Sequence, residues 1–373
     1  MDSEDEDRER ETTADLEAAL ERNPADQETR LELVIRYREE GLYEEALKTL
    51  ESGLSFPGDR RPIYRWLADI RRRLHDLPGS KEALDRCLEL GSDDPWDYEQ
   101  LITICARLGK LREAEEAVKT WARRQPGRPA VARCERAVRR FRHFSRARPK
   151  TGFSHKEIAY GLYGTALLGT PHDDGIEIWR YYYNCFDEYD CGLVLWRFLE
   201  LARALELRMG SVVAVQDGFS LPLALATSEI AGLPLKSLDS EFEGEAPLLV
   251  AATVDDPAVL AEDRAALEAR APARIYCLVL SGPFVFFRQE IPPDFACMET
   301  YAAVSWQSEV AADEDQMRGT ISRRAAQNVA RKIAAAYGKC EQSPEPNIRQ
   351  QVEWYTVKHR ELSCLQEPIW LTR

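Results

Sequence analysis

The chain has 373 residues, of which 44% are hydrophobic, and its 64 acidic side chains outnumber its 50 basic ones to give a net charge of −14. This composition excludes a wholly disordered chain, and 20 glycines and 20 prolines are too few for a collagen-like or low-complexity protein. The length and composition are typical of a protein with two or three domains. We expect it to be soluble, because no stretch approaches the roughly 18 consecutive apolar residues that cross a bilayer.

Residues 1–13 form an acidic tail without an apolar segment. The tail lacks the features of a secretory or transit peptide, so we expect it to be solvated and disordered. The nine cysteines of the chain include no CxxC pair, and several lie in apolar segments. We therefore expect free, buried thiols and a cytoplasmic protein.

Residues 14–128 carry an internal repeat of about 34 residues, a spacing that we call the repeat length. The segments GLYEEA at 41–46 and GKLREA at 109–114 begin two repeat lengths apart. The segment GSKEA at 79–83 lies between them but is slightly out of phase, so we expect a lengthened turn between the helices of that copy. Internal repeats of this length indicate a stack of helical units.

The pattern resembles the tetratricopeptide repeat (TPR), in which each unit is a pair of helices. The resemblance implies three repeats, with residues 14–24 as the second helix of a partial one. The resemblance implies that small residues let the two helices of a pair approach closely, and that glycine opens the turn between them. The repeat-defining residues are Leu33, Tyr37, Gly41, Tyr43, Ala46, Leu67, Ile70, Leu74, Ala83, Tyr98, Leu101, Gly109, Ala114 and Trp121.

A superhelix of this kind implies an adaptor or scaffold whose concave face binds an extended peptide or a helix of a partner protein. The alternative is that the repeats pack only against the C-terminal half of the same chain. The sequence does not identify the polar residues that face the groove.

Residues 129–150 predict a basic capping helix. Apolar residues recur at 130, 134, 137, 141 and 144 and form one face. The stretch 119–150 holds twelve basic residues and one acid. Its arginines can cover the apolar face, pair with acids of the chain, its acidic tail included, or bind an acidic partner or nucleic acid at residues 123–148. The candidate anion-binding residues are Arg133, Arg136, Arg139, Arg140 and Arg142.

Residues 151–373 predict an α/β domain with a mainly parallel sheet, so the expected fold class is an α-solenoid followed by an α/β domain. Buried strands are expected at 211–215, 233–238, 248–252, 275–280 and 284–287. Helices are expected at 193–207, 221–231, 258–270 and 317–337. Continuous apolar strands separated by helices indicate a parallel sheet covered on both faces. The sequence does not decide whether residues 352–357 form a strand or a helix.

Residues 210–283 resemble the core of type I phosphoribosyltransferases. The segment VVAVQDGFS at 212–220 is similar to the family's first strand and pyrophosphate-side loop, and LLVAATVDDPAV at 248–259 falls where the family carries its phosphoribosyl-pyrophosphate motif. In place of the family's acidic pair this chain has Ala251 and Ala252, and Pro257 removes an amide donor from the phosphate loop. The resemblance therefore implies a degenerate domain without catalytic residues.

The alternatives are an unrelated α/β domain, or an enzyme that binds a nucleotide or a sugar phosphate and recruits its substrate through the repeats. The candidate ligand loops hold Asp217, Gly218, Ser220, Asp255 and Asp256. The acids and cysteines at 172–174 and 185–191 match no structural zinc pattern. We expect no metal and no cofactor, and whether the chain is an enzyme stays open.

Overall fold

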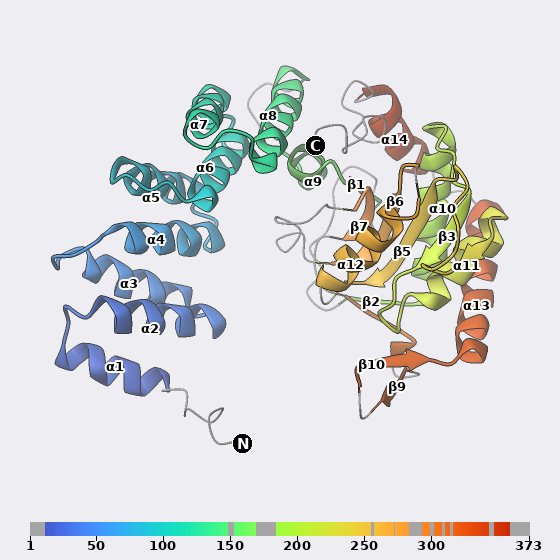
Figure 1. The fold of residues 1–373 in the computed structure, drawn as a ribbon, viewed down its shortest axis with the longest axis horizontal. Coiled ribbons are helices and arrows are strands. Elements are labelled where there is room, and N and C mark those ends of the chain that lie inside the picture. The colour runs from blue at the N-terminus through green and yellow to red at the C-terminus, as the bar shows by residue number, and fades with distance from the viewer. Residues whose placement is uncertain are drawn as a thin grey trace. The chain divides into compact units, whose positions relative to one another are not determined.

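The computed structural model describes residues 12–147, 153–168, 184–254, 257–271, 273–282, 293–298, 302–307, 310–313, 316–342 and 347–358. The chain divides into two compact units, Met1–Gly152 and Phe153–Arg373. Figure 1 labels their helices and strands. The predicted strand at 284–287 and the residues Asp255 and Asp256 lie outside the described residues.

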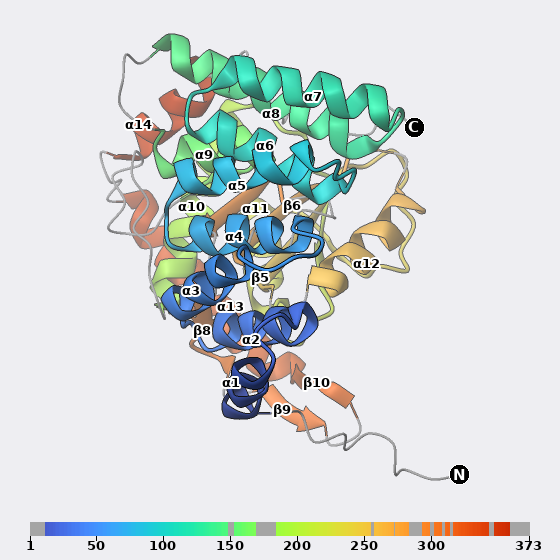
Figure 2. The ribbon, with the colours of Figure 1, turned by 90° about the vertical axis from the view of Figure 1, so that its left-hand side faces the viewer.

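The first unit is a stack of helices, which Figure 2 shows following one another from α1 to α8. The helices are α1 (Thr13–Arg22), α2 (Gln27–Glu39), α3 (Tyr43–Gly53), α4 (Arg61–Arg73), α5 (Leu77–Glu89), α6 (Pro95–Arg107), α7 (Leu111–Arg124) and α8 (Pro129–Ala147). Helices α2, α4, α6 and α8 each begin one repeat length after the one before, and α3, α5 and α7 have the same spacing. The pairs α2–α3, α4–α5 and α6–α7 are therefore three repeats, preceded by the helix α1 and followed by the helix α8.

The lengthened turn predicted near Gly79 is wrong, because the second repeat keeps the spacing of the other two. Gly79 lies inside α5, where its amide donates to the N-cap carboxylate of Asp76 at 2.9 Å. The residue that stands one repeat length from both Gly41 and Gly109 is His75. All three residues have a positive φ, which is 77° at Gly41, 62° at His75 and 71° at Gly109. A histidine adopts the left-handed conformation that glycine adopts in the other two turns.

The small residue where α5 approaches α4 is Ser80 rather than Ala83. Ser80 occupies the position that Ala46 and Ala114 occupy in the other repeats, and all three are 0% exposed. Its hydroxyl donates to the carbonyl oxygen of Ala68 on α4 at 2.6 Å. Ala83 is buried as well, one helical turn further on.

The core of the first unit contains most of the residues predicted to define the repeat. Leu33, Leu67 and Leu101, which occupy one position in successive repeats, are all 7% exposed or less. The rings of Tyr98 and Trp121 stack with their centroids 5.8 Å apart. The predicted apolar face of α8 is buried too, with Phe141 at 0% and Phe144 at 1% exposure.

The second unit is built on a six-stranded sheet in the order β1-β7-β6-β5-β3-β4, in which every neighbouring pair is parallel. Its strands are β1 (Ala166–Leu167), β3 (Ser211–Ala214), β4 (Leu235–Lys236), β5 (Pro247–Thr253), β6 (Tyr276–Ser281) and β7 (Phe295–Met298). Two shorter sheets accompany it, formed by β2 (Asn184–Phe186) with β8 (Ala302–Val304), and by β9 (Val310–Asp313) with β10 (Gln316–Ile321). The prediction of a mainly parallel sheet is confirmed.

Helices cover both faces of the large sheet, as Figure 1 shows for α12 on one side and α10, α11 and α13 on the other. They are α9 (His155–Tyr163), α10 (Glu188–Ala204), α11 (Leu221–Ala231), α12 (Pro257–Glu268), α13 (Arg323–Gln342) and α14 (Asn347–Glu353), which continues into a π-helical turn (Trp354–Lys358). Alternate strand residues such as Leu249 and Ala251 share a core with α12. The segment 352–357, for which the sequence left strand and helix open, lies in α14 and the π-helical turn and is therefore helical.

The prediction of a helix from residue 317 is wrong at its first turn. Residues 316–321 form β10, which pairs antiparallel with β9. The helix α13 begins after Ser322, whose hydroxyl accepts a hydrogen bond from the amide of Ala325 at 3.2 Å. The β-branched Thr320 and Ile321 favour the strand, and a serine favours the start of a helix.

Candidate functional site

The first helices of the repeats and the capping helix, α2, α4, α6 and α8, form a surface that we call the A face; α1, α3, α5 and α7 form the B face. Neighbouring helices of the A face are linked by charged side chains. The guanidinium of Arg38 on α2 lies 5.0 Å from the ring centroid of Trp66 on α4. Arg133 on α8 forms an ion pair with Glu99 on α6 at 3.4 Å.

Asp69 is the centre of the charge cluster on α4. It is 8% exposed, and its carboxylate accepts from Arg72 at 2.5 Å and from Arg73 at 3.0 Å. Burial alone would raise the pKa of Asp69, but the two guanidinium groups outweigh it and lower the pKa. Two cations on one carboxylate leave the cluster with a net positive charge.

Arginines recur at equivalent positions of the A-face helices. One position is occupied by Arg38 on α2, Arg72 on α4 and Arg140 on α8. A second is occupied by Arg73 on α4 and Arg107 on α6. Only Arg140 of these five was predicted, because the other four lie outside the basic stretch 119–150. A strict repeat spacing would have aligned them.

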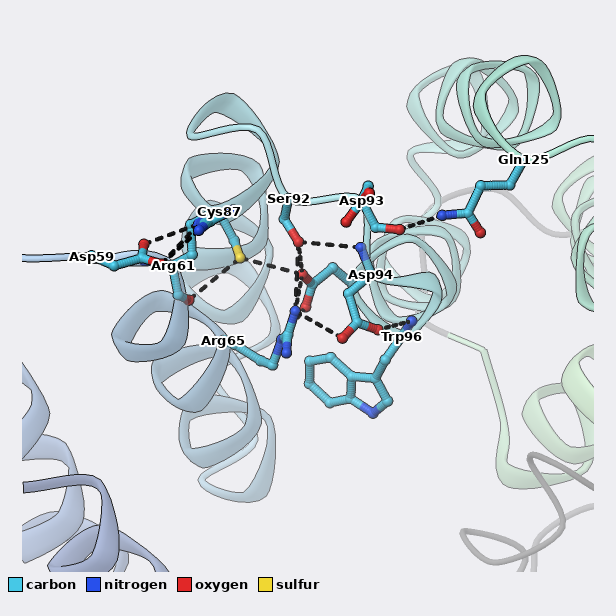
Figure 3. A network of polar contacts seen from close by, with 10 residues as sticks. Asp59, Arg61, Arg65, Cys87, Ser92, Asp93, Asp94, Trp96 and Gln125 are labelled. Atoms are coloured by element: carbon cyan, nitrogen blue, oxygen red, sulfur yellow. Dashed lines mark hydrogen bonds and ion pairs between the residues drawn. The ribbon is translucent and has the colours of Figure 1, made fainter. Parts of the chain in front are cut away.

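A buried polar network joins the second and third repeats (Figure 3). The carboxylate of Asp97 on α6 is 0% exposed and accepts two hydrogen bonds of 2.8 Å from Arg65 on α4. The hydroxyl of Ser92 and the thiol of Cys87 donate to it at 2.5 Å and 3.3 Å. Burial raises the pKa of that thiol to about 12, so it stays protonated. These groups satisfy one another, and their role is to hold adjacent repeats together.

The arginines of α8 differ in their burial, and two of them form ion pairs with the preceding repeat. Arg133 and Arg142 form ion pairs with Glu99 and Glu115 on the preceding repeat. Arg140 is buried at 9% exposure, whereas Arg136 is half-buried and Arg139 is exposed. The paired arginines tie the capping helix to the solenoid.

The loop after β3 contains three of the residues predicted to bind a ligand. One carboxylate oxygen of Asp217 accepts from the amides of Phe219 and Ser220 at 2.9 Å and 2.8 Å, and the other accepts from the hydroxyl of Ser220 at 2.6 Å. Gly218 lies between them with a φ of 78°. A phosphate loop needs amides that point outward. Here the amides after Asp217 donate to its own side chain.

Other contacts close the same loop. The hydroxyl of Ser220 accepts from the amide of Ala252 at 2.8 Å, and Ser220 is 0% exposed. The indole of Trp306 donates to the carbonyl oxygen of Phe219 at 3.0 Å, and Asp263 accepts from the amide of Gln216 at 2.7 Å. Trp306 and Asp263 were not predicted, since each lies far along the chain from the loop it contacts.

Within the part of the chain that the structure describes, no group of three or more His, Cys, Asp or Glu side chains is arranged to hold a metal ion. No helix among those residues is long and apolar enough to span a bilayer.

No protein-family model and no curated protein matches the chain. Solved structures match part of it. A crystal structure of MamA is 20% identical in sequence, with 34% of this chain and 74% of that chain covered and a TM-score of 0.31. A second MamA structure is 18% identical, with 36% of this chain and 74% of that chain covered and a TM-score of 0.33. The structure of YrrB, described as a TPR protein with an unusual peptide-binding site, is 19% identical, with 35% of this chain and 67% of that chain covered and a TM-score of 0.32.

None of these matches supports the resemblance of residues 210–283 to phosphoribosyltransferases. The spacing of its helices makes the N-terminal unit a helical repeat that resembles a TPR solenoid, and a parallel sheet forms the centre of the second unit.

Proposed function

We propose that the protein is a cytoplasmic adaptor, which uses the A face of its repeats to bind an extended segment of a partner protein. The observation that supports this proposal is the charge cluster of the A face. Asp69 is shared by Arg72 and Arg73, and Arg38 is held over the ring of Trp66. Side chains held in this way are ordered before binding, so less conformational entropy is lost on association.

The net charge of the cluster favours a partner segment that carries carboxylates. A guanidinium has five N–H donors and pairs well with carboxylates, so arginines suit a segment that carries acids. The aromatic ring of Trp66 is half-buried and offers an apolar contact beside the charges. The proposed ligand is therefore an extended acidic segment with an apolar residue next to its acids.

We propose that the predicted α/β domain, residues 151–373, is not catalytic and that residues 14–128 and 129–150 act as solenoid and cap. Ala251 and Ala252 stand where an acidic pair would bind ribose, and the amides after Asp217 are occupied. The buried free cysteines of both units support a reducing compartment.

The test is photo-crosslinking of the full chain in its host. Ile35 on α2 and Thr103 on α6 occupy the position that Asp69 occupies on α4, and both are partly exposed. A photoreactive phenylalanine at either position should crosslink to one partner protein, and the same residue at Lys48 or Lys119, on B-face helices, should not. Nuclease treatment before isolation distinguishes a protein bound directly from one held through nucleic acid.

The double variant Arg72→Glu, Arg73→Glu should abolish the A-face crosslink, because it reverses the charge around Asp69. The matched control Arg86→Glu changes an exposed arginine of the B-face helix α5, which forms an ion pair with the exposed Glu89. Equal crosslinking in both variants would contradict the proposal, as would a crosslink found only from the B-face positions.

A further inference from the structure

One position of the repeats lies on the side of the first helix that faces the B-face helices. In the three repeats it is occupied in turn by Tyr37, Arg71 and Cys105. The helix before each of them carries an acid at a second equivalent position, namely Glu17, Glu51 or Asp85. An acid thus precedes each of the three repeats at this position, whereas the large side chain is missing from the third repeat.

In the first two repeats the large side chain contacts the acid. The hydroxyl of Tyr37 donates to Glu17, and Tyr37 is 7% exposed. Arg71 donates to Glu51 at 3.1 Å and to the carbonyl oxygen of Gly79 at 3.1 Å. Each of these side chains bridges the first helix of its repeat to the helix before it.

In the third repeat the short Cys105 leaves a hollow of about 460 Å³ between α5 and α7. Cys105 lies at its base with Tyr98 and Leu101 of α6, and Leu88 and Ala117 complete an apolar lining. Burial raises the pKa of the Cys105 thiol to about 12, so the base of the hollow is uncharged. The volume lies within the range of about 300–1,000 Å³ that is typical of ligand pockets.

The rim of the hollow carries the acid left without its bridging side chain. Asp85 accepts from Lys81 at 2.7 Å, and Lys81 also contacts Glu113 on α7 at 2.6 Å. The residue one repeat length before Lys81 is Leu47. In the second repeat a leucine therefore stands where the third has Lys81, so Arg71 meets no lysine there. A cation that entered the hollow of the third repeat would meet Lys81.

We propose that this hollow is a second docking site, which binds a tyrosine side chain presented by a segment of a partner protein. The ring would lie on Tyr98, Leu101 and Ala117, as the ring of Tyr37 lies within the core of the first repeat. The hydroxyl would donate to Asp85, as that of Tyr37 donates to Glu17. A neutral donor suits the site better than an arginine, because Lys81 already supplies the positive charge.

The experiment is a selection of displayed random peptides on the full chain, with counter-selection on the variant Cys105→Tyr. That variant places in the third repeat the residue that the first repeat carries, so it should fold and fill the hollow. The surviving peptides should share a tyrosine. Replacing that tyrosine by phenylalanine should weaken binding about tenfold, because the hydrogen bond to a carboxylate is lost. Replacing it by arginine should weaken binding at least as much.

Two further measurements keep the outcome clear. Asp85→Asn should weaken the same peptides about tenfold, while Arg72→Glu on the A face should leave them unaffected. Titration of the wild-type chain with p-cresol, followed by amide chemical shifts, should show saturable shifts at Leu88 and Ala117 that are absent from Cys105→Tyr. If that variant is poorly folded by circular dichroism, Cys105→Met takes its place.

Selected peptides without a common tyrosine, or binding that Cys105→Tyr leaves unchanged, would overturn the proposal. Stronger binding of arginine peptides would overturn the choice of side chain. Sedimentation provides the last check. If the wild-type chain self-associates and Cys105→Tyr abolishes that association, the hollow binds a second copy of the chain, which would also overturn the proposal.

Discussion

Arg65 on α4, which is partly exposed, and the buried Asp97 on α6 form an ion pair that joins the second repeat to the third. The two hydrogen bonds between them are both 2.8 Å, and Asp97 is fully buried. Arg65 also contacts the N-cap residue Asp94 at 3.0 Å. One side chain therefore fixes both the start of α6 and its position against α4.

Arg65→Met should destabilise the first unit by about 3 kcal/mol, because it leaves the Asp97 carboxylate buried without its cation. Combining it with Asp97→Asn should recover part of the loss, since the buried group is then neutral. Urea unfolding of each variant gives the change. The control is Arg61→Met, whose partner Asp59 is exposed, and it should cost less than about 0.5 kcal/mol. Equal losses in both variants would refute the link between repeats.

His75 holds a left-handed conformation at a position where the other repeats have glycine. His75→Gly should therefore raise the free energy of unfolding by about 1 kcal/mol, and Gly41→Ala or Gly109→Ala should lower it by a similar amount. A Cβ atom added at Gly41 or Gly109 meets nothing within 4 Å, so the loss reports backbone conformation alone. Thermal unfolding checks all three, and a destabilised His75→Gly would contradict the assignment of this turn.

The periodic parts of the fold were predictable because each residue type repeats at the spacing of its helix. The repeat length predicted the helix pairs of the first unit, and α11 was predicted with its observed bounds. The second repeat was misplaced because a histidine replaces the turn glycine and Ser80 replaces the small alanine. The structure tolerates both residues, but neither is the residue type that the repeat pattern has at that position. At residues 316–321 a short strand adjoins a long helix, and the helical pattern was extended too far.

The contacts of the candidate sites were less predictable, because they join residues that are distant along the chain. Trp306 reaches the loop of Phe219 across 87 residues, and Arg65 reaches Asp97 across 32. The resemblance of residues 212–220 to a pyrophosphate-side loop suggested a ligand loop after β3. That resemblance does not say that the amides of Phe219 and Ser220 donate to the carboxylate of Asp217.

Tyr355 and Gln351 satisfy the backbone of the edge strand β1. The hydroxyl of Tyr355 accepts from the amide of Leu167 at 2.8 Å and donates to its carbonyl oxygen at 3.0 Å. Gln351 donates to the carbonyl oxygens of Leu167 and Leu168 at 3.0 Å and 2.8 Å. These two side chains replace the neighbouring strand that an edge lacks.

Tyr355→Phe should destabilise the second unit by about 2 kcal/mol, because it leaves the buried amide of Leu167 without an acceptor. Thr356→Val is the control on the next residue, where the lost hydrogen bond to Val352 is only partly buried, and it should cost about 0.5 kcal/mol. Denaturant unfolding followed by circular dichroism measures both. A Tyr355→Phe variant as stable as the control would show that β1 is satisfied without the hydroxyl.

Asp217 should make the stability of the second unit depend on pH. Burial raises the pKa of its carboxyl to about 6, although the hydrogen bonds from Ser220 and Phe219 lower it. The folded chain therefore binds a proton between about pH 6 and pH 4 that the unfolded chain does not bind. The free energy of unfolding should rise by about 2–3 kcal/mol from this group as the pH falls through that window.

Asp217→Asn should lack this rise, because the amide does not titrate. Thermal unfolding of the wild type and the variant between pH 4 and pH 7 gives the difference between the two curves. Asp239→Asn, at a side chain that is 87% exposed, is the control and should follow the wild type. A difference between wild type and Asp217→Asn that is constant over the range would mean that Asp217 stays ionised in the folded chain, with its hydrogen bonds outweighing its burial.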